Sequence, residues 1–123
     1  MVREGRQERR TTDSALANLA SLHALTLDQN QISDLSPLAG LRNLQTLYLG
    51  QNQVDNLSPL AGLTSLENLG FWQNQVSDLS PLAGLTNLHY LSLSGNQVSD
   101  ISALVVNSRA GGIGAGDSVY LQV

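Results

Sequence analysis

The stretch LRNLQTLYLGQNQVDNLSPLAG, residues 41–62, is followed at once by a variant of itself, LTSLENLGFWQNQVSDLSPLAG, residues 63–84. Both stretches have the same order of apolar and polar residues. The same step of 22 residues separates four asparagines: Asn30, Asn52, Asn74 and Asn96. A fixed period between 20 and 50 residues is typical of solenoids and other stacked repeats. The chain is therefore predicted to be a repeat protein.

Each asparagine closes the pattern LxxLxLxxN, as in Leu44, Leu47, Leu49 and Asn52. Alternation within LxL predicts a short strand with leucines facing inward and variable residues facing outward. The segment that follows repeats Ser-Pro, as in Ser36-Pro37, and ends at a glycine three residues later. The serine is expected to cap a single turn, of 3₁₀ type, that begins at the proline.

These repeats resemble the leucine-rich repeat family, and in particular its short, 22-residue, internalin-like class of bacterial proteins. The resemblance covers about residues 13–104. It implies an α/β solenoid, a right-handed coil with a parallel β-sheet on its concave face and short 3₁₀ or irregular segments on its convex face. It also implies a non-enzymatic module whose sheet binds a partner, most often a protein.

The repeated asparagines are interpreted as a structural ladder. Each stands at the sharp corner after a strand, where backbone groups would otherwise be buried without partners. We expect its side chain to hydrogen-bond the backbone of the next coil. Phe71 replaces the third leucine of its strand and should point into the core, whereas Trp72, one residue later, should point outward as the largest exposed side chain of the concave face.

Three segments are predicted. Residues 1–12 form a charged, disordered leader; residues 13–106 hold about four full repeats and an N-terminal half-copy; residues 107–123 form a glycine-rich loop and the last strand of a lengthened, truncated repeat. In that strand Val119 and Leu121 follow Leu91 and Leu93 by 28 residues. The chain ends before the expected asparagine corner, which favours a fragment of a larger protein.

Composition excludes several classes of function. The chain has no cysteine, so disulfides and thiolate chemistry are absent. Four of its six basic residues lie in the first ten positions, and the remainder is acidic, which disfavours nucleic-acid binding. Neither a signal peptide nor a membrane span is found, so membrane insertion is not expected. Localisation stays open, with a secreted or cell-surface protein implied only by the resemblance.

Chemistry-bearing residues are better explained by structure than by catalysis. His23 and His89 occupy one position in coils three strands apart, about 14 Å at ordinary strand spacing, too far to share a metal ion. The glycines after Arg109 precede a strand instead of following one, unlike a dinucleotide-binding loop. Asp34, Asp78 and Asp100 recur at one position, where a calcium ladder is an alternative to the favoured turn-capping role. No cofactor, metal or catalytic residue is predicted.

The outward positions of the sheet remain as the candidate site. Counting the first leucine of each strand as one, positions three, five and seven carry four of the five aromatic residues, with a spacing on the order of 8 to 14 Å. The predicted binding residues are Tyr48, Trp72, Tyr90, Tyr120, Asp28, Asn68, Thr46 and Ser92. Nearby glutamines and Glu67 would form a polar rim.

Two interpretations compete for this aromatic patch. Exposed tyrosine and tryptophan are typical of partner-binding surfaces. Alternatively, the rings cover neighbouring glycines, since Gly70 lies beside Tyr48 and Gly50 beside Trp72. The favoured function is binding of a protein partner on the concave sheet. A structural spacer within a larger surface or signalling protein and a glycan-binding module are the alternatives.

Overall fold

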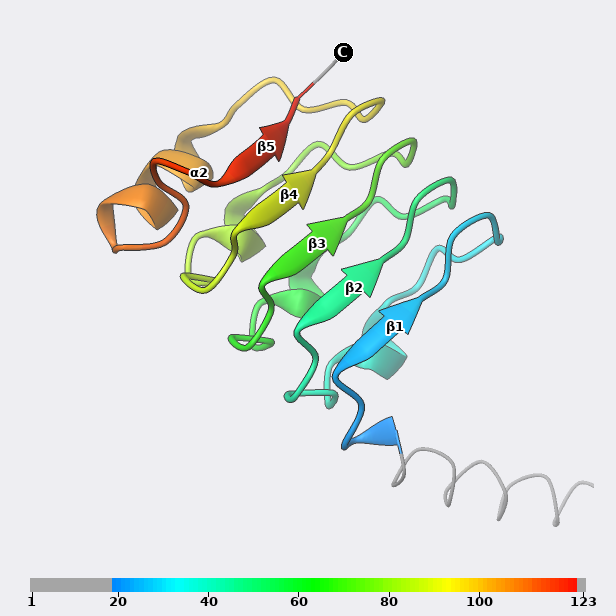
Figure 1. The fold of residues 1–123 in the computed structure, drawn as a ribbon. Coiled ribbons are helices and arrows are strands. Elements are labelled where there is room, and N and C mark those ends of the chain that lie inside the picture. Colours follow the sequence, from blue (N-terminus) through cyan, green and yellow to red (C-terminus); the bar gives the residue numbers. More distant parts are fainter. Residues whose placement is uncertain (1–18, 122–123) are drawn as a thin grey trace, which may run out of the picture.

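Five parallel strands form one sheet in the computed structural model, which describes residues 19–121 (Figure 1). The strands lie in chain order, β1 to β5. In sequence the elements are β1 (Ala24–Thr26), η1 (Ser36–Leu38), β2 (Thr46–Tyr48), η2 (Ser58–Leu60), β3 (Asn68–Gly70), η3 (Ser80–Leu82), β4 (Tyr90–Ser92), α2 (Ser102–Arg109) and β5 (Ser118–Tyr120). The predicted leader, residues 1–12, lies outside the described residues.

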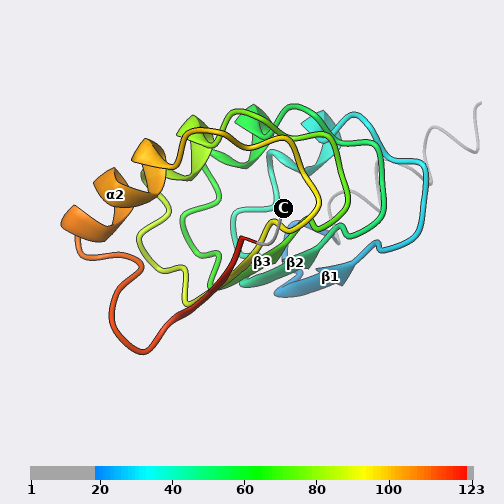
Figure 2. The ribbon, with the colours of Figure 1, turned by 90° about the horizontal axis from the view of Figure 1, so that it is seen from above.

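The register of the sheet follows the sequence period. Leu47 pairs with Leu25 on one side and with Leu69 on the other, each a full repeat away. The short helices line the side of the coil opposite the sheet (Figure 2). This arrangement confirms the predicted α/β solenoid, including the 3₁₀ turns and the re-entry of the chain into the sheet at Val119.

The core is a stack of leucine layers between the sheet and the returning segments. Leu47, Leu69 and Leu91 are fully buried, as is Phe71, which confirms its predicted inward orientation. Leu57, Leu60 and Leu63 close the same layers from the helical side. Burial of one leucine contributes about 1.5–3 kcal/mol, and no coil buries its apolar face without a neighbour. The stability of the fold therefore comes from stacking.

The asparagine ladder is structural, but it points opposite to the expected direction. Asn74 donates to the carbonyls of Phe71 and Trp72 in its own coil and to that of Leu49 in the preceding coil, at 2.9–3.2 Å. Its Oδ1 accepts the Val54 N–H, also of the preceding coil, at 2.9 Å. The expectation of a bond to the next coil was wrong, because the side chain at this corner faces the preceding coil.

The helical turns are capped by a different residue from the one expected. Ser36 is the first residue of η1 and not its N-cap; the N-cap position is taken by Leu35, which makes no side-chain cap hydrogen bond. Instead, Oδ1 of Asp34 accepts the Ser36 N–H at 2.9 Å. Asn56, Asp78 and Asp100 make the same bond in the later coils. The turn-capping role of this aspartate position is confirmed, and the capping role given to serine is corrected.

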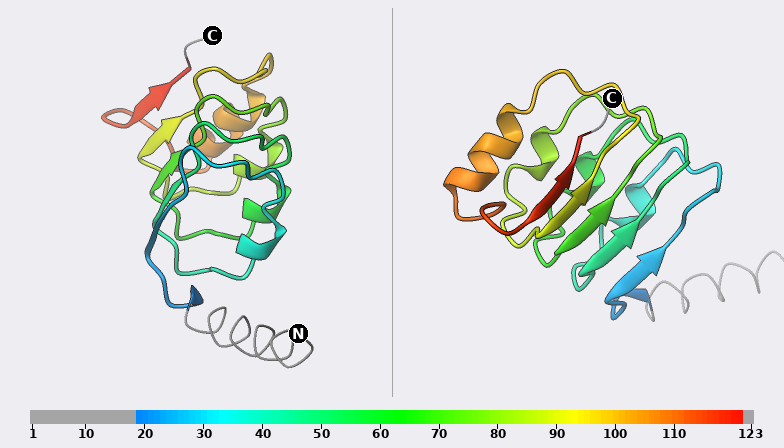
Figure 3. Two further views of the ribbon diagram at one scale, coloured as in Figure 1. Left: turned by 90° about the vertical axis from the view of Figure 1, so that its right-hand side faces the viewer. Right: turned by 45° about the horizontal axis from the view of Figure 1, so that its top comes forward.

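The last coil replaces the 3₁₀ turn with the α-helix α2, which extends into the segment expected to be loop. Figure 3 shows this helix at the β5 end of the solenoid. Asn107 is completely buried in it. Its Nδ2 donates to the carbonyls of Leu82 and Leu85 at 2.8 and 2.9 Å, and its Oδ1 accepts the Ile113 N–H at 2.8 Å. One side chain thereby fixes both the helix and the glycine-rich loop to the segment at η3, which ends the preceding coil.

Within residues 19–121, none of the helices has the length and hydrophobicity of a transmembrane segment.

Candidate functional site

Four aromatic rings form a continuous chain on the outer face of the sheet, which is the predicted concave face. The centroid of Tyr48 lies 6.0 Å from that of Trp72 and 6.2 Å from that of Tyr90, and Tyr90 lies 5.6 Å from Tyr120. These distances are in the range of attractive ring contacts. We call this chain of Trp72, Tyr48, Tyr90 and Tyr120 the aromatic platform.

Two glycines, which have no side chain, let the rings approach one another more closely than strand spacing predicts. A Cβ at Gly50 would overlap the indole of Trp72, and a Cβ at Gly70 would meet both that indole and Cδ1 of Tyr48. The expected spacing of about 8 to 14 Å was therefore too large. Trp72 is partly buried rather than fully exposed, and Tyr120, at 52%, is among the most exposed large apolar side chains of the described residues.

The polar residues around the rings are held by the sheet itself. Asp28 Oδ1 accepts the Gly50 N–H at 2.7 Å. Asn68 donates to the Thr46 hydroxyl at 3.1 Å. Ser92 lies on the same face but is only 7% exposed, so its hydroxyl offers little contact area.

Two glutamines border the platform where the strands end. Gln51 donates from Nε2 to Oε1 of Gln73 at 2.9 Å, and both side chains are exposed. Gln29, Gln51 and Gln73 all have positive φ, between 55° and 59°, and Gly95 takes the equivalent place in coil four with φ 73°. All three glutamines are exposed, and they are among the residues that the sequence predicts for a polar rim.

The opposite border, where the strands begin, contains a histidine and a carboxylate that sequence reasoning did not pair. His89 Nδ1 lies 3.1 Å from Oδ1 of Asp117, and Asp117 Oδ2 accepts the Gly114 N–H at 2.7 Å. The hydrogen bond from the Gly114 N–H lowers the pKa of Asp117 most, and the hydrogen bond with His89 lowers it further. The 28-residue step of the last coil is the signal that could have placed Asp117 beside His89.

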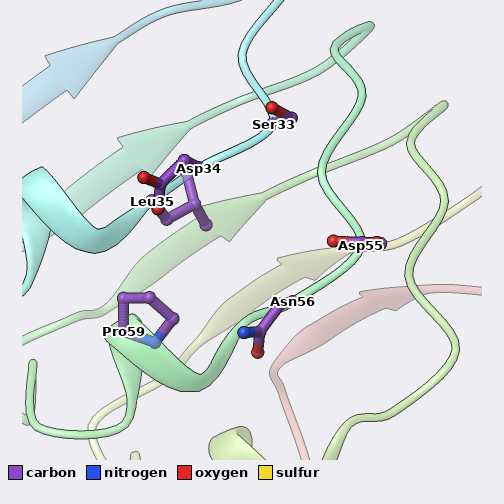
Figure 4. A pocket seen from close by; sticks show the side chains of 6 residues that line it. All are labelled: Ser33, Asp34, Leu35, Asp55, Asn56 and Pro59. Atoms are coloured by element: carbon purple, nitrogen blue, oxygen red, sulfur yellow. The ribbon is translucent and has the colours of Figure 1, made fainter.

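On the helical side, a shallow cavity of about 340 Å³ lies between the loops that precede η1 and η2 (Figure 4). Its lining residues are Ser33, Asp34, Leu35, Asp55, Asn56 and Pro59. Hydrogen bonds from the Ser36 backbone and then its side chain lower the pKa of Asp34. Among residues 19–121 no three His, Asp or Glu side chains are grouped as metal ligands are. The Asp34 carboxylate caps η1 by accepting the Ser36 N–H.

A family model for tandem leucine-rich repeats matches residues 14–62 and 64–105. The chain belongs to the leucine-rich repeat family. Its repeats are internalin-like, as the 22-residue period indicates, and proteins built from such repeats are generally protein-interaction modules. A comparison with curated proteins gave no match.

Solved structures support the same class. Internalin C2 of Listeria monocytogenes superimposes with a TM-score of 0.72 at 44% identity, covering 88% of this chain and 44% of that protein. The internalin InlF of the same species gives 0.76 at 37% identity, covering 86% and 30%. A leucine-rich repeat protein of Leptospira interrogans gives 0.61 at 28% identity, covering 71% and 23%. The chain therefore spans less than half the length of each.

Proposed function

We propose that the aromatic platform is the surface through which this leucine-rich-repeat segment binds a partner protein. The observation that carries the proposal is the unbroken contact of four rings across strands β2 to β5, at centroid distances of 5.6–6.2 Å. Tyrosine and tryptophan supply large contact areas with few rotatable bonds, and they dominate binding hot spots.

The need to cover glycines explains only half of the platform. Trp72 and Tyr48 occupy the space above Gly50 and Gly70. Tyr90, in contrast, pairs with Asn68 and Ser118, and Tyr120 pairs with Ser92. The last two rings therefore cover no glycine of a paired strand position. A binding role accounts for their presence on the same face.

The proposed role is binding without catalysis. Asp28, Asn68 and Asp117 lie near the rings, but each already accepts or donates a hydrogen bond that fixes the sheet or a loop. A catalytic site needs a nucleophile or an acid–base pair directed at a substrate. The polar groups of the platform are instead directed at their own backbone and neighbours.

The test begins with selection of binders from a random-peptide phage library on the folded chain. Each recovered peptide is then measured against Tyr90→Ala/Tyr120→Ala, which leaves the glycine-covering rings in place, and against Val106→Ala on α2 as a control. Val106 is 53% exposed and lies away from the platform. We expect most peptides to lose at least tenfold in affinity on the first variant and none on the second.

The triple variant Tyr48→Ala/Trp72→Ala/Tyr90→Ala completes the test, with circular dichroism to check that it folds. If the recovered peptides bind the folded platform variants as tightly as the native chain, the proposal is wrong and a structural spacer is the better description.

Glycan recognition is the second candidate, because rings and amides occur together on this face. The Gln51–Gln73 hydrogen bond and Asn68 place amide groups at the edge of the aromatic platform. Aromatic faces with amide donors suit a protein surface and a sugar about equally well. A glycan array decides between them: ring-dependent signals support a glycan, and silence across the array leaves protein binding as the function.

The resemblance to internalins also implies a secreted or cell-surface setting for the whole protein. The reading frame around this segment tests that proposal, since a secretion signal or an anchor would support it.

A further inference from the structure

The charges of the described residues are strongly one-sided. The chain contains no lysine, and residues 19–121 contain seven carboxylates and only two arginines. Arg42 lies in the turn between η1 and β2, and Arg109 is the last residue of α2. Neither belongs to a strand of the sheet. The strands that carry the aromatic platform therefore contain no lysine or arginine.

One carboxylate marks the Trp72 end of the platform. Asp28 accepts the Gly50 N–H at 2.7 Å, and Gly50 is the residue whose missing side chain makes room for the Trp72 indole. The indole therefore extends over the neighbouring strand toward Asp28. Because Asp28 is only partly buried, its negative charge is available beside the ring.

Two carboxylates mark the other end. Glu67 is partly buried, and its carbonyl accepts the Tyr90 N–H at 3.1 Å, so the two residues are adjacent across strands β3 and β4. Asp117 precedes β5 and reaches His89 at 3.1 Å. Glu67 is thus hydrogen-bonded to Tyr90 across the strands, and Asp117 contacts the residue that directly precedes Tyr90.

Aromatic faces attract cations because the ring quadrupole is negative above and below the plane. Carboxylates at both ends add Coulomb attraction for a positive ligand and repulsion for a negative one. A planar guanidinium also stacks on rings and forms bidentate bonds with carboxylates.

From this arrangement we infer that the platform recognises a cationic, arginine- or lysine-bearing segment of its protein partner. The inference rests on the proposed function, and it adds the chemistry of the ligand. Side chains spaced along such a segment would lie over the rings, with their charges toward Asp28 at one end and Glu67 or Asp117 at the other.

The test is a titration with three peptides of equal length on a Gly-Ser backbone, carrying three arginines, three glutamines or three glutamates. Trp72 is the single tryptophan of the chain, so its emission reports binding at the platform itself. We expect the arginine peptide to change this emission and to bind at least about tenfold more tightly than the glutamine peptide, with affinity falling as salt rises. The glutamate peptide should bind most weakly.

The chain's own four N-terminal arginines carry the same chemistry. The titration is therefore made on the full chain and on a full-length variant in which Arg3, Arg6, Arg9 and Arg10 are glutamine. Cation-selective binding by either protein supports the inference, and its absence from both overturns it.

Charge-removing variants locate the attraction. Asp28→Asn keeps an oxygen for the Gly50 N–H, and Glu67→Gln keeps the shape of its side chain. Together they should weaken the arginine peptide about fivefold to tenfold. The matched control is Asp55→Asn, an exposed carboxylate in the loop between β2 and η2. An equal loss in the control would show general attraction to an acidic protein and would overturn the inference.

The outcomes also separate this inference from the proposed function. If the glutamine peptide binds as tightly as the arginine peptide, and both need Tyr90 and Tyr120, the platform is a binding surface without preference for cations. If no peptide of any charge depends on these rings, the proposed function fails as well.

Discussion

Single residues shape the platform as much by what they lack as by what they carry. Gly50 and Gly70 leave space that the Trp72 indole and one edge of Tyr48 occupy. The sequence shows the neighbouring positions of glycine and ring once the strand register is known. It does not show that the rings lean into contact, because that depends on side-chain rotamers that spacing alone leaves undetermined.

Gly50→Ala tests this use of empty space. The added methyl group would displace the Trp72 ring, so we expect red-shifted tryptophan emission and a fall in the free energy of unfolding of about 1 kcal/mol. Gly62→Ala is the matched control, because nothing lies within 4 Å of its Cβ position. It should leave the emission unchanged. Unaltered emission in Gly50→Ala would contradict the described packing of Trp72.

The left-handed corner after each strand gives a second residue-level prediction. Gln29 adopts φ 58°, whereas coil four uses Gly95 at φ 73°. Because a side chain disfavours this region, Gln29→Gly should raise the free energy of unfolding by a few tenths to about 1 kcal/mol. Gly95→Ala should lower it, since its Cβ would also lie 3.1 Å from Cγ of Gln73. Urea unfolding measures both free energies. A fall for Gln29→Gly, or a rise for Gly95→Ala, would refute the assignment of strain to this corner.

Among the elements, the 3₁₀ turns were predictable and their caps were not. The Ser-Pro pattern predicts one short turn, and the structure has it at Ser36–Leu38. The cap was misassigned because Ser36 and Asp34 are both good acceptors two residues apart. Only the backbone conformation shows that the helix starts at the serine and that its N–H is directed at the aspartate. The direction of the asparagine ladder was mispredicted for a similar reason, because the sequence offers backbone partners in both neighbouring coils and only the structure shows that the preceding coil is used.

The capping carboxylates should make the elements sensitive to acid. Backbone N–H donors lower the pKa of Asp34, Asp78 and Asp100 below the ordinary aspartate value. A carboxylate whose pKa is lowered in the folded state adds stability above its unfolded-state pKa, and this stability is lost as the pH falls through the folded-state value. We therefore expect the midpoint of thermal unfolding to fall as the pH drops below about 4.

A non-titrating variant isolates this effect. In Asp34→Asn/Asp78→Asn/Asp100→Asn each amide oxygen can still accept the cap hydrogen bond, as Asn56 does naturally at 2.9 Å. The variant should lose less stability between pH 6 and about pH 3 than the native chain, by calorimetry. Identical acid sensitivity in the two proteins would exclude these aspartates as its source.

For the whole molecule, a repeat of fixed length predicts a modular fold. Each coil contacts only its neighbours, so deletion of residues 63–84 should join coil two to coil four in register. We expect the shortened chain to fold with a parallel sheet and a lower midpoint of unfolding, because one stacking interface is lost. A deletion of residues 63–86, two residues out of register, should fail to fold. Circular dichroism and thermal unfolding distinguish the two, and equal behaviour would contradict the repeat boundaries.

The large-scale architecture was predictable from sequence because one period sets strand, turn and core at once. The structure of the last coil was less predictable from the sequence. There the proline is absent and the step lengthens to 28 residues, and the helix that forms is held to the preceding coil by the buried Asn107 and packs with Leu104 in the core. Which face of the solenoid binds a partner is a property of the whole molecule that the repeat pattern leaves open.

Hydroxyl-radical footprinting tests the central claim about that face most directly. The chain is oxidised alone and in complex with the tightest peptide from the library selection. Tyr48, Trp72, Tyr90 and Tyr120 serve as reporters, and the fully buried Phe71 serves as the internal standard. The platform account predicts that the complex protects the four rings while Val105 and Val106 of α2 oxidise at an unchanged rate. Protection confined to α2 or to the 3₁₀ side, with the four rings oxidised as in the free chain, would contradict it.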